Sequence, residues 1–200
     1  MSVAYAELAV TTNFSFLRGG SGPAEMVVQA IACGLAGIGI ADRNSVAGVV
    51  RAYTQLRDMK EELEEEADQD RKKAIEAFRI APGARLVFAD GTPDILAFPQ
   101  DRAAWGRLTR LLSVGKSRAE KGECILYIED LEEYAPGLNL IVIPPARIQA
   151  QALTGLLKRL KAAASGKWLR LGPTLLYRGD DQRRLAKLSE IAAGVVPLIA

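Results

Sequence analysis

The sequence predicts an α/β fold, because short apolar segments alternate with longer segments of helical periodicity along its 200 residues. Segments 35–41 and 138–143 are typical of buried strands, and segment 102–114 has apolar side chains at helical spacing. No internal repeat or low-complexity linker divides the chain, so one domain over 1–200 is expected. The alternation fits an open doubly wound sheet and a (β/α) barrel equally well, and both alternatives stay open at this point.

The first half of the chain is predicted to contain two strands and two helices. A strand over 3–10 is followed by a helix over 23–33, because Pro23 suits the first helical position and Glu25 places a negative charge in the first turn. Gly34 ends this helix, and the buried strand 35–41 ends at Asp42. A second helix is expected to run from about 46 into a charged helical insertion around 57–80, whose acidic block is interpreted as a solvated surface.

The second half is predicted to repeat the alternation after a β-hairpin over 85–98 that turns at Asp90-Gly91. Asp101 opens a helix over 102–114, and its apolar face is interpreted as core. Further helices are expected at 147–164 and 180–193, with strands at 138–143 and 167–177. The chain closes with the apolar segment 195–200, which leaves no loop after its last strand, so we expect a fragment of something longer.

Composition limits the classes of function and the compartment. Lys and Arg outnumber Asp and Glu by only 26 to 24, a balance that does not require a nucleic-acid partner. Cys33 and Cys124 have no Cys-x-x-Cys spacing and no secretory leader before them, so we expect free, packed thiols in a reducing compartment. With no apolar stretch of about 20 residues, the chain is expected to be cytoplasmic and away from membranes.

The chain contains no histidine. Imidazole is the commonest ligand of catalytic zinc and the usual acid or base near neutral pH, so its absence closes most routes to hydrolytic chemistry. The glycine-rich segments 19–22 and 34–39 match neither a dinucleotide fingerprint nor a phosphate-binding P-loop. The acid pairs Asp68/Asp70, Glu129/Asp130 and Asp180/Asp181 are interpreted as helix starts rather than as a polymerase metal clamp.

Several segments in order resemble one family. They are Leu-Ala-Val-Thr at 8–11, Asn-Phe-Ser-Phe-Leu-Arg-Gly at 13–19, Asp-Arg-Asn at 42–44, Ala-Gly-Val-Val-Arg-Ala at 47–52, Asp-Arg-Ala-Ala-Trp-Gly-Arg-Leu at 101–108 and Val-Pro-Leu-Ile-Ala at 196–200. Together they resemble the polymerase and histidinol phosphatase (PHP) domain at the N-terminus of error-prone DNA polymerases related to the bacterial DNA polymerase III alpha subunit. The resemblance implies a distorted (β/α) barrel, here incomplete at its C-terminus.

The resemblance also implies where a metal site would lie. Active members of the family hold metal ions with histidines and acids at strand ends. The corresponding positions in this chain are Ala9, Thr11, Gly22, Asp42, Arg43 and Arg85. Only Asp42 keeps a ligand-type side chain, and one carboxylate cannot hold a metal at useful affinity. The resemblance therefore implies a vestigial site with no cofactor, and we hypothesise that Arg43 or Arg85 pairs with Asp42 in place of the ions.

Direct DNA contact is the remaining candidate activity. The loop after the 102–114 helix carries Lys116, Arg118 and Lys121, which could touch a phosphate backbone, although solvated surface charge is the ordinary interpretation. The leading expectation is a catalytically inactive structural and interaction module of an error-prone polymerase. Its expected partners are the remainder of the polymerase chain, DNA through that polymerase, and other damage-tolerance proteins. The alternatives are a metal-dependent phosphoesterase or proofreading exonuclease, and a stand-alone binding module.

Overall fold

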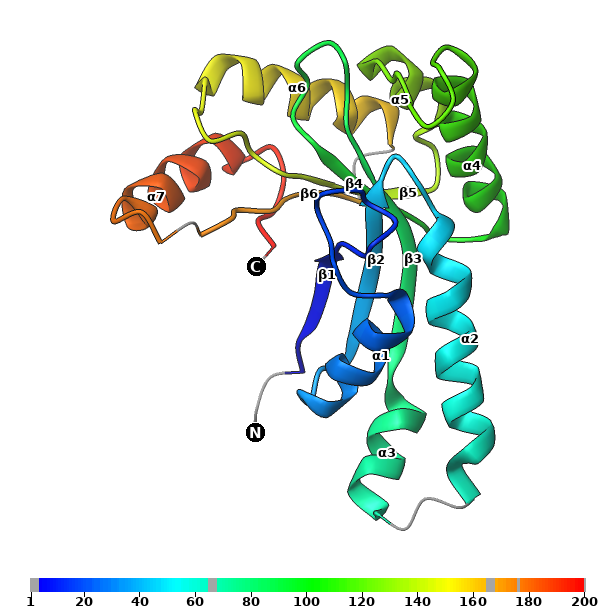
Figure 1. Cartoon of the computed structure of the whole chain (residues 1–200). Coiled ribbons are helices and arrows are strands. Elements are labelled where there is room, and N and C mark those ends of the chain that lie inside the picture. The colour runs from blue at the N-terminus through cyan, green and yellow to red at the C-terminus, as the bar shows by residue number, and fades with distance from the viewer. Residues whose placement is uncertain (1–3, 65–67, 165–167, 176, 200) are drawn as a thin grey trace. The chain divides into compact units, whose positions relative to one another are not determined.

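A computed structural model describes residues 4–64, 68–164, 168–175 and 177–199 of the chain. Its helices and strands belong to two compact units, residues 1–85 and 86–200, and each unit has strands with helices packed beside them (Figure 1). The alternation of strands and helices confirms the predicted α/β class. One PHP-like domain over 1–200 stays a prediction.

The first unit is built on three parallel strands. They are β1 (Ala6–Val10), β2 (Gly37–Arg43) and β3 (Arg79–Leu86), and the helical segments are α1 (Pro23–Ala32), α2 (Ala47–Glu61), the 3₁₀ turn η1 (Glu62–Glu64) and α3 (Gln69–Ala77). β2 lies between β1 and β3 and pairs with both. Parallel neighbours need crossover connections, which the helices provide. The first six residues of β2 are buried, as a central strand requires.

Local chemistry sets the ends of these elements. Pro23 begins α1, and the Glu25 carboxylate accepts a hydrogen bond from the N–H of Gly22 (2.8 Å). At Gly37 the strand β3 leaves no room for a side chain on β2, since a Cβ atom there would lie 2.4 Å from the carbonyl oxygen of Arg79. Glycine is therefore required at the start of β2.

The second unit combines antiparallel and parallel pairing. Its strands are β4 (Ile95–Pro99), β5 (Leu138–Val142) and β6 (Leu169–Leu171), and its helices are α4 (Arg102–Ser117), α5 (Ile128–Tyr134), α6 (Ala150–Ala163) and α7 (Asp181–Ala192). β5 pairs antiparallel with β4 and parallel with β6. The core consists mainly of leucines, and Leu108, Leu140 and Leu157 have no exposed surface.

Most predicted elements are confirmed within a few residues, and the differences are local. The charged segment forms the end of α2, η1 and a separate α3 that begins after the N-cap Asp68; residues 65–67 lie outside the described ranges. The strand predicted at 167–177 is too long, since β6 covers three residues. The helix α5 was not predicted, because seven residues are too few for a clear period.

The two cysteines are free, as expected. Cys124 is half-buried against Gly115 of α4, and burial raises the pKa of its thiol. Cys33 is exposed at the end of α1, so the prediction that both thiols pack is wrong for this residue. Within the described ranges, no helix combines the length and apolar composition needed to cross a bilayer.

Candidate functional site

The six positions that the resemblance assigns to a vestigial site all belong to the first unit. Ala9 and Thr11 lie at the end of β1, Asp42 and Arg43 at the end of β2, Arg85 near the end of β3, and Gly22 at the start of α1. Because carboxyl ends of parallel strands meet at one edge, the fold brings these segments together. We call this region, comprising residues 9–22, 42–51 and 83–85, the carboxyl edge.

Asp42 is the centre of the carboxyl edge. Its side chain is fully buried, yet both carboxylate oxygens have donors. Oδ1 accepts from the N–H of Thr12 (2.8 Å) and from the hydroxyl of Ser15 (2.7 Å), and Oδ2 accepts from the hydroxyl of Thr12 (2.8 Å). A buried carboxylate is tolerated only when such donors replace its lost hydration.

The donors of Asp42 are themselves part of a connected network. The N–H of Arg43 donates to the hydroxyl of Ser15 (2.8 Å), and the N–H of Phe14 donates to the hydroxyl of Thr12 (3.2 Å). Gly48 of α2 lies directly beside this network, since a Cβ there would be 2.6 Å from Oδ2 of Asp42. The carboxylate therefore joins the loop after β1, the end of β2 and the start of α2.

The hypothesis that an arginine pairs with Asp42 is wrong. Successive side chains of a strand point to opposite faces of the sheet, so Arg43 points away from the face that carries Asp42. Arg43 is also exposed, whereas Asp42 is buried. In the β2–β3 register Arg85 is the partner of Arg43, whereas Asp42 is opposite Ala84. In the described part of the chain, the Asp42 carboxylate has Thr12 and Ser15 as partners and no arginine.

The carboxyl edge does not fit a metal ion. Within the described ranges, no three His, Cys, Asp or Glu side chains come together in a way that could hold one. The one acid at the assigned positions already uses both oxygens for hydrogen bonds, so a cation would have to displace Thr12 and Ser15. Ala9 and Gly22 carry no donor atoms in their side chains. The hydroxyl of Thr11 donates to the carbonyl of Ala9 (3.4 Å).

Thr12, Ser15 and Gly48 surround Asp42 but were not predicted as site residues, although Ser15 and Gly48 lie in segments that carry the resemblance. Thr12 and Ser15 stand 30 and 27 positions from Asp42, and Ser and Thr are common in loops for many reasons. The one signal that could have indicated them is their closeness in sequence to the positions that the resemblance assigns to metal ligands. Only the parallel pairing of β1 with β2 brings the three side chains together.

One of the three basic side chains at the end of α4 and in the loop after it is already engaged within the second unit. Arg118 forms a two-point ion pair with Asp130 of α5, and its guanidinium also lies over the ring of Tyr127 (5.5 Å). The hydrogen bonds from Arg118 lower the pKa of Asp130, although partial burial raises it. Lys116 and Lys121 are exposed, and DNA contact through them stays a prediction.

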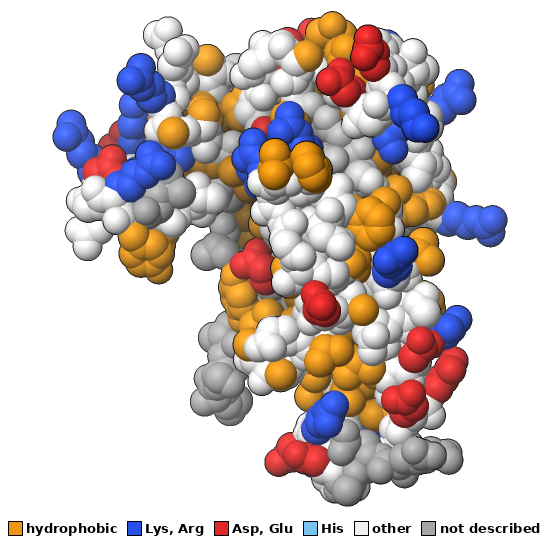
Figure 2. Space-filling view, in the orientation of Figure 1, with side chains coloured by type: hydrophobic (Ala, Val, Ile, Leu, Met, Phe, Trp, Pro, Cys, Tyr) orange, Lys and Arg blue, Asp and Glu red, His pale blue; other side chains and the backbone are white. Residues whose placement is uncertain are grey.

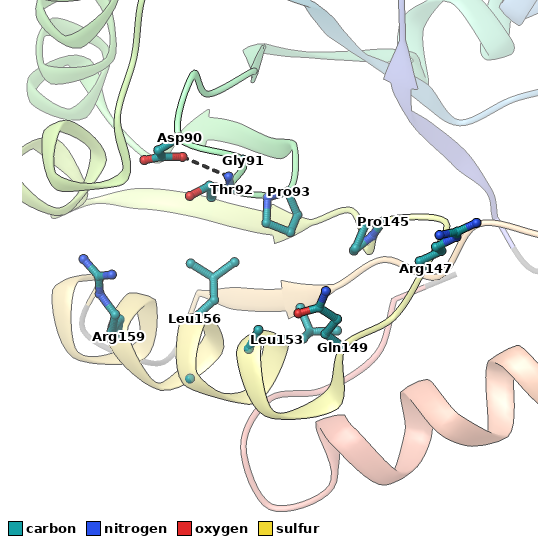
Figure 3. A pocket seen from close by; sticks show the side chains of 12 residues that line it. Asp90, Gly91, Thr92, Pro93, Pro145, Arg147, Gln149, Leu153, Leu156 and Arg159 are labelled. Atoms are coloured by element: carbon teal, nitrogen blue, oxygen red, sulfur yellow. Dashed lines mark hydrogen bonds between the residues drawn. The ribbon is translucent and has the colours of Figure 1, made fainter.

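A shallow pocket of about 570 Å³ lies within the second unit. Figure 3 shows it between the turn 90–93, the segment that follows β5, and α6, with Arg147 and Arg159 at opposite ends. Partial burial raises the pKa of the Asp90 carboxyl. Hydrogen bonds from the N–H groups of Ile128 and Thr92, among other donors, outweigh this effect, so the pKa of Asp90 lies below its ordinary value. Arg159 is held by Glu129 and Glu132. Asp90 and Arg159 of the pocket thus already have partners within the second unit.

Comparison with solved structures defines the fold. A protein proposed to be a metal-dependent phosphoesterase from Bifidobacterium adolescentis matches 98% of this chain and 87% of its own, with a TM-score of 0.57 and 12% identity. An amidohydrolase from Chromobacterium violaceum was solved with bound sulfate and no metal. The match covers 97% of this chain and 85% of the amidohydrolase, with a TM-score of 0.55 and 14% identity. The chain thus has a phosphoesterase-like α/β fold, which confirms the predicted PHP-type class.

Curated relatives of similar sequence narrow the comparison from a fold to one kind of protein. The error-prone DNA polymerase of Rhodopseudomonas palustris strain BisB5 is 56% identical over 199 residues, which are 98% of this chain and 17% of that protein. The error-prone DNA polymerase of Bradyrhizobium sp. strain ORS 278 is 49% identical over 205 residues, which cover 99% of this chain and 16% of that polymerase. No family model matches the chain. The resemblance to error-prone DNA polymerases is confirmed, and the chain spans about a sixth of their length.

Proposed function

We propose that the chain is a catalytically degenerate, metal-free PHP domain that serves as a structural and interaction module of a cytoplasmic error-prone DNA polymerase. In this role it packs against the remainder of a longer polymerase chain and supports translesion synthesis during DNA replication and damage tolerance. Its contacts with DNA and with other damage-tolerance proteins are made through that polymerase. The isolated chain polymerises no DNA and hydrolyses no phosphate ester.

The observation that carries the proposal is the state of Asp42. A carboxylate that binds a catalytic cation must offer lone pairs to it, together with several further anionic or imidazole ligands. Asp42 instead accepts three internal hydrogen bonds in a fully buried position. The residue therefore supports the shape of the carboxyl edge rather than chemistry there.

Metal analysis tests the inactive part of the proposal. The chain is purified from cells supplied with zinc and manganese, and its metal content is measured by mass spectrometry beside hydrolysis of bis(p-nitrophenyl) phosphate with added manganese. We expect metal far below one ion per chain and no hydrolysis above the buffer. A stoichiometric ion with metal-dependent turnover would establish the phosphoesterase or exonuclease alternative instead.

The polymerase context is tested separately by the gene. We expect the reading frame to continue beyond residue 200 into a segment with the aspartates of a polymerase active site. In the full-length protein, deletion of residues 1–200 is expected to reduce the yield of soluble polymerase. A reading frame that stops at residue 200 would favour the stand-alone binding module.

A further inference from the structure

We propose that the carboxyl edge of the first unit binds single-stranded DNA through exposed aromatic rings and unpaired arginines. The surface consists of Phe14, Phe16, Leu17, Arg18, Arg43 and Arg51, and we call it the aromatic-arginine surface. It is distinct from the basic loop that contains Lys116. The inference goes beyond the proposed structural role and does not require that role to be correct.

The loop after β1 displays large apolar side chains to solvent. Phe16 is 85% exposed and Leu17 is 86% exposed, while Phe14 is more than a third exposed. Leu17 also has a φ of 59°, a left-handed conformation that leucine rarely adopts. Exposed apolar side chains gathered beside a residue in a strained conformation are typical of binding surfaces.

These side chains stand on a fixed base. The N–H groups of Arg18 and Gly19 donate to the carbonyl of Ser15 (2.9 and 3.2 Å), which closes a tight turn. The hydroxyl of Ser15 is in turn held by the buried carboxylate of Asp42 (2.7 Å). Because the turn is anchored at its centre, Phe16 is presented without a further cost in backbone entropy on binding.

Three arginines of the same surface have no acidic partner among the described residues. Arg18, Arg43 and Arg51 are exposed, and Arg51 lies over the ring of Phe14 at 5.4 Å from its centroid. Arg57, further along α2, is by contrast paired with Asp58 and Glu61. Figure 2 shows the acidic side chains of α2 gathered toward the end of the helix that adjoins η1.

The negative groups within the carboxyl edge do not cancel this positive charge. Asp42 is buried, so it reduces the positive potential without offering an exposed partner. Glu25 at the start of α1 is exposed and accepts a hydrogen bond from the N–H of Gly22, so its one negative charge stands against three exposed arginines. The exposed part of the surface is therefore cationic and apolar at once.

Single-stranded DNA matches both properties. Its phosphates pair with arginines, and its unpaired bases stack on phenylalanine rings, a combination used by proteins that bind single strands without sequence preference. Duplex DNA hides the faces of its bases and offers the phosphates alone. An acidic, apolar protein segment would satisfy the arginines but would not select for accessible bases.

Binding is measured by fluorescence anisotropy with the chain 1–200 and labelled oligo(dT), at several salt concentrations, beside a duplex of the same length. We expect the single strand to bind more tightly than the duplex, with affinity falling as salt rises. Phe16→Ala should weaken single-strand binding about tenfold. Arg51→Gln should lower affinity and reduce the salt slope by about one.

Matched control variants test whether binding depends on this surface or on any exposed ring or arginine of the chain. Tyr177→Ala removes a ring that is 92% exposed in the second unit, and Arg57→Gln removes a paired arginine from α2. Both controls should bind like the parent chain, and circular dichroism checks that all variants fold. Equal binding by Phe16→Ala and the parent chain would overturn the proposal. An absence of binding to oligo(dT) by the parent chain would overturn it as well.

Discussion

Two acidic side chains, Asp42 in the first unit and Asp130 in the second, organise their surroundings in different ways. Asp42 is fully buried, and its donors in the described part of the chain are hydroxyl and amide groups. Asp130 is also buried, with 9% of its surface exposed, and it holds the partly exposed guanidinium of Arg118 in a two-point ion pair. A buried carboxylate can therefore be kept without a countercharge when short donors converge on it, or it can be paired with a long cationic side chain that reaches it from the surface.

The difference predicts the largest effect for Asp42→Ala. This substitution removes three hydrogen bonds and leaves the donors of Thr12 and Ser15 unsatisfied in the interior. We expect the free energy of unfolding to fall by about 3 kcal/mol, measured by urea denaturation.

Asp58→Ala is the matched control for Asp42→Ala, because Asp58 is a solvent-exposed acid on α2. Its effect should stay within about 0.5 kcal/mol. Equal stability of the two variants would mean that the buried network contributes nothing beyond surface charge.

A smaller effect is expected for Gly48→Ala, which tests how tightly the Asp42 network is packed. The new Cβ would lie 2.6 Å from Oδ2 of Asp42 and 3.1 Å from the hydroxyl of Thr12, so backbone or side chains must move. We expect a loss of about 2 kcal/mol in thermal or urea unfolding.

Gly106→Ala provides the comparison, because Gly106 is a helical glycine whose Cβ would meet nothing within 4 Å. Alanine should stabilise α4 by about 0.5 kcal/mol, since it restricts the unfolded chain and favours the helix. If both alanine variants changed stability in the same direction, the close contact at Gly48 would be disproved.

The smallest expected effect is the response of the second unit to acid. Hydrogen bonds from Arg118 lower the pKa of Asp130, and donors such as the Ile128 N–H lower that of Asp90, although partial burial raises it. The resulting stabilisation is present above the unfolded-state pKa of aspartate and is lost as the pH falls through the folded-state pKa.

Urea midpoints at ~pH 6 and ~pH 3 measure this loss. Asp130→Asn should be less stable than the parent chain at ~pH 6 and should lose less on acidification. Glu133→Gln, a change of an exposed acid on the same helix, should leave the acid response unchanged. An identical loss in Asp130→Asn and the parent chain would contradict the assignment to this ion pair.

The sequence predicted the architecture better than the site. Asp101 was expected to open a helix, and its carboxylate does accept from the N–H of Ala104 (2.7 Å) at the start of α4. Local signals of this kind act within four residues, so they can be read from sequence. The apolar faces of α4 and β5 were visible for the same reason.

The site depended on contacts that no local pattern contains. The Asp42–Thr12 hydrogen bond joins positions 30 apart, and its existence follows only from the pairing of β1 with β2. The arginine hypothesis failed because a charge argument ignored strand alternation, which places Arg43 on the other face from Asp42. Arg118 looked like a free cation because its partner belongs to a short helix that was not predicted.

The separation of Asp42 from its donors has a consequence for the order of folding. During synthesis the segment 12–19 leaves the ribosome well before residue 42, so the carboxylate that fixes it does not yet exist. Closing a loop of 30 residues costs chain entropy that is repaid only when β2 docks beside β1. The turn that carries Phe16 should therefore become protected from amide hydrogen exchange together with β2, and not before it.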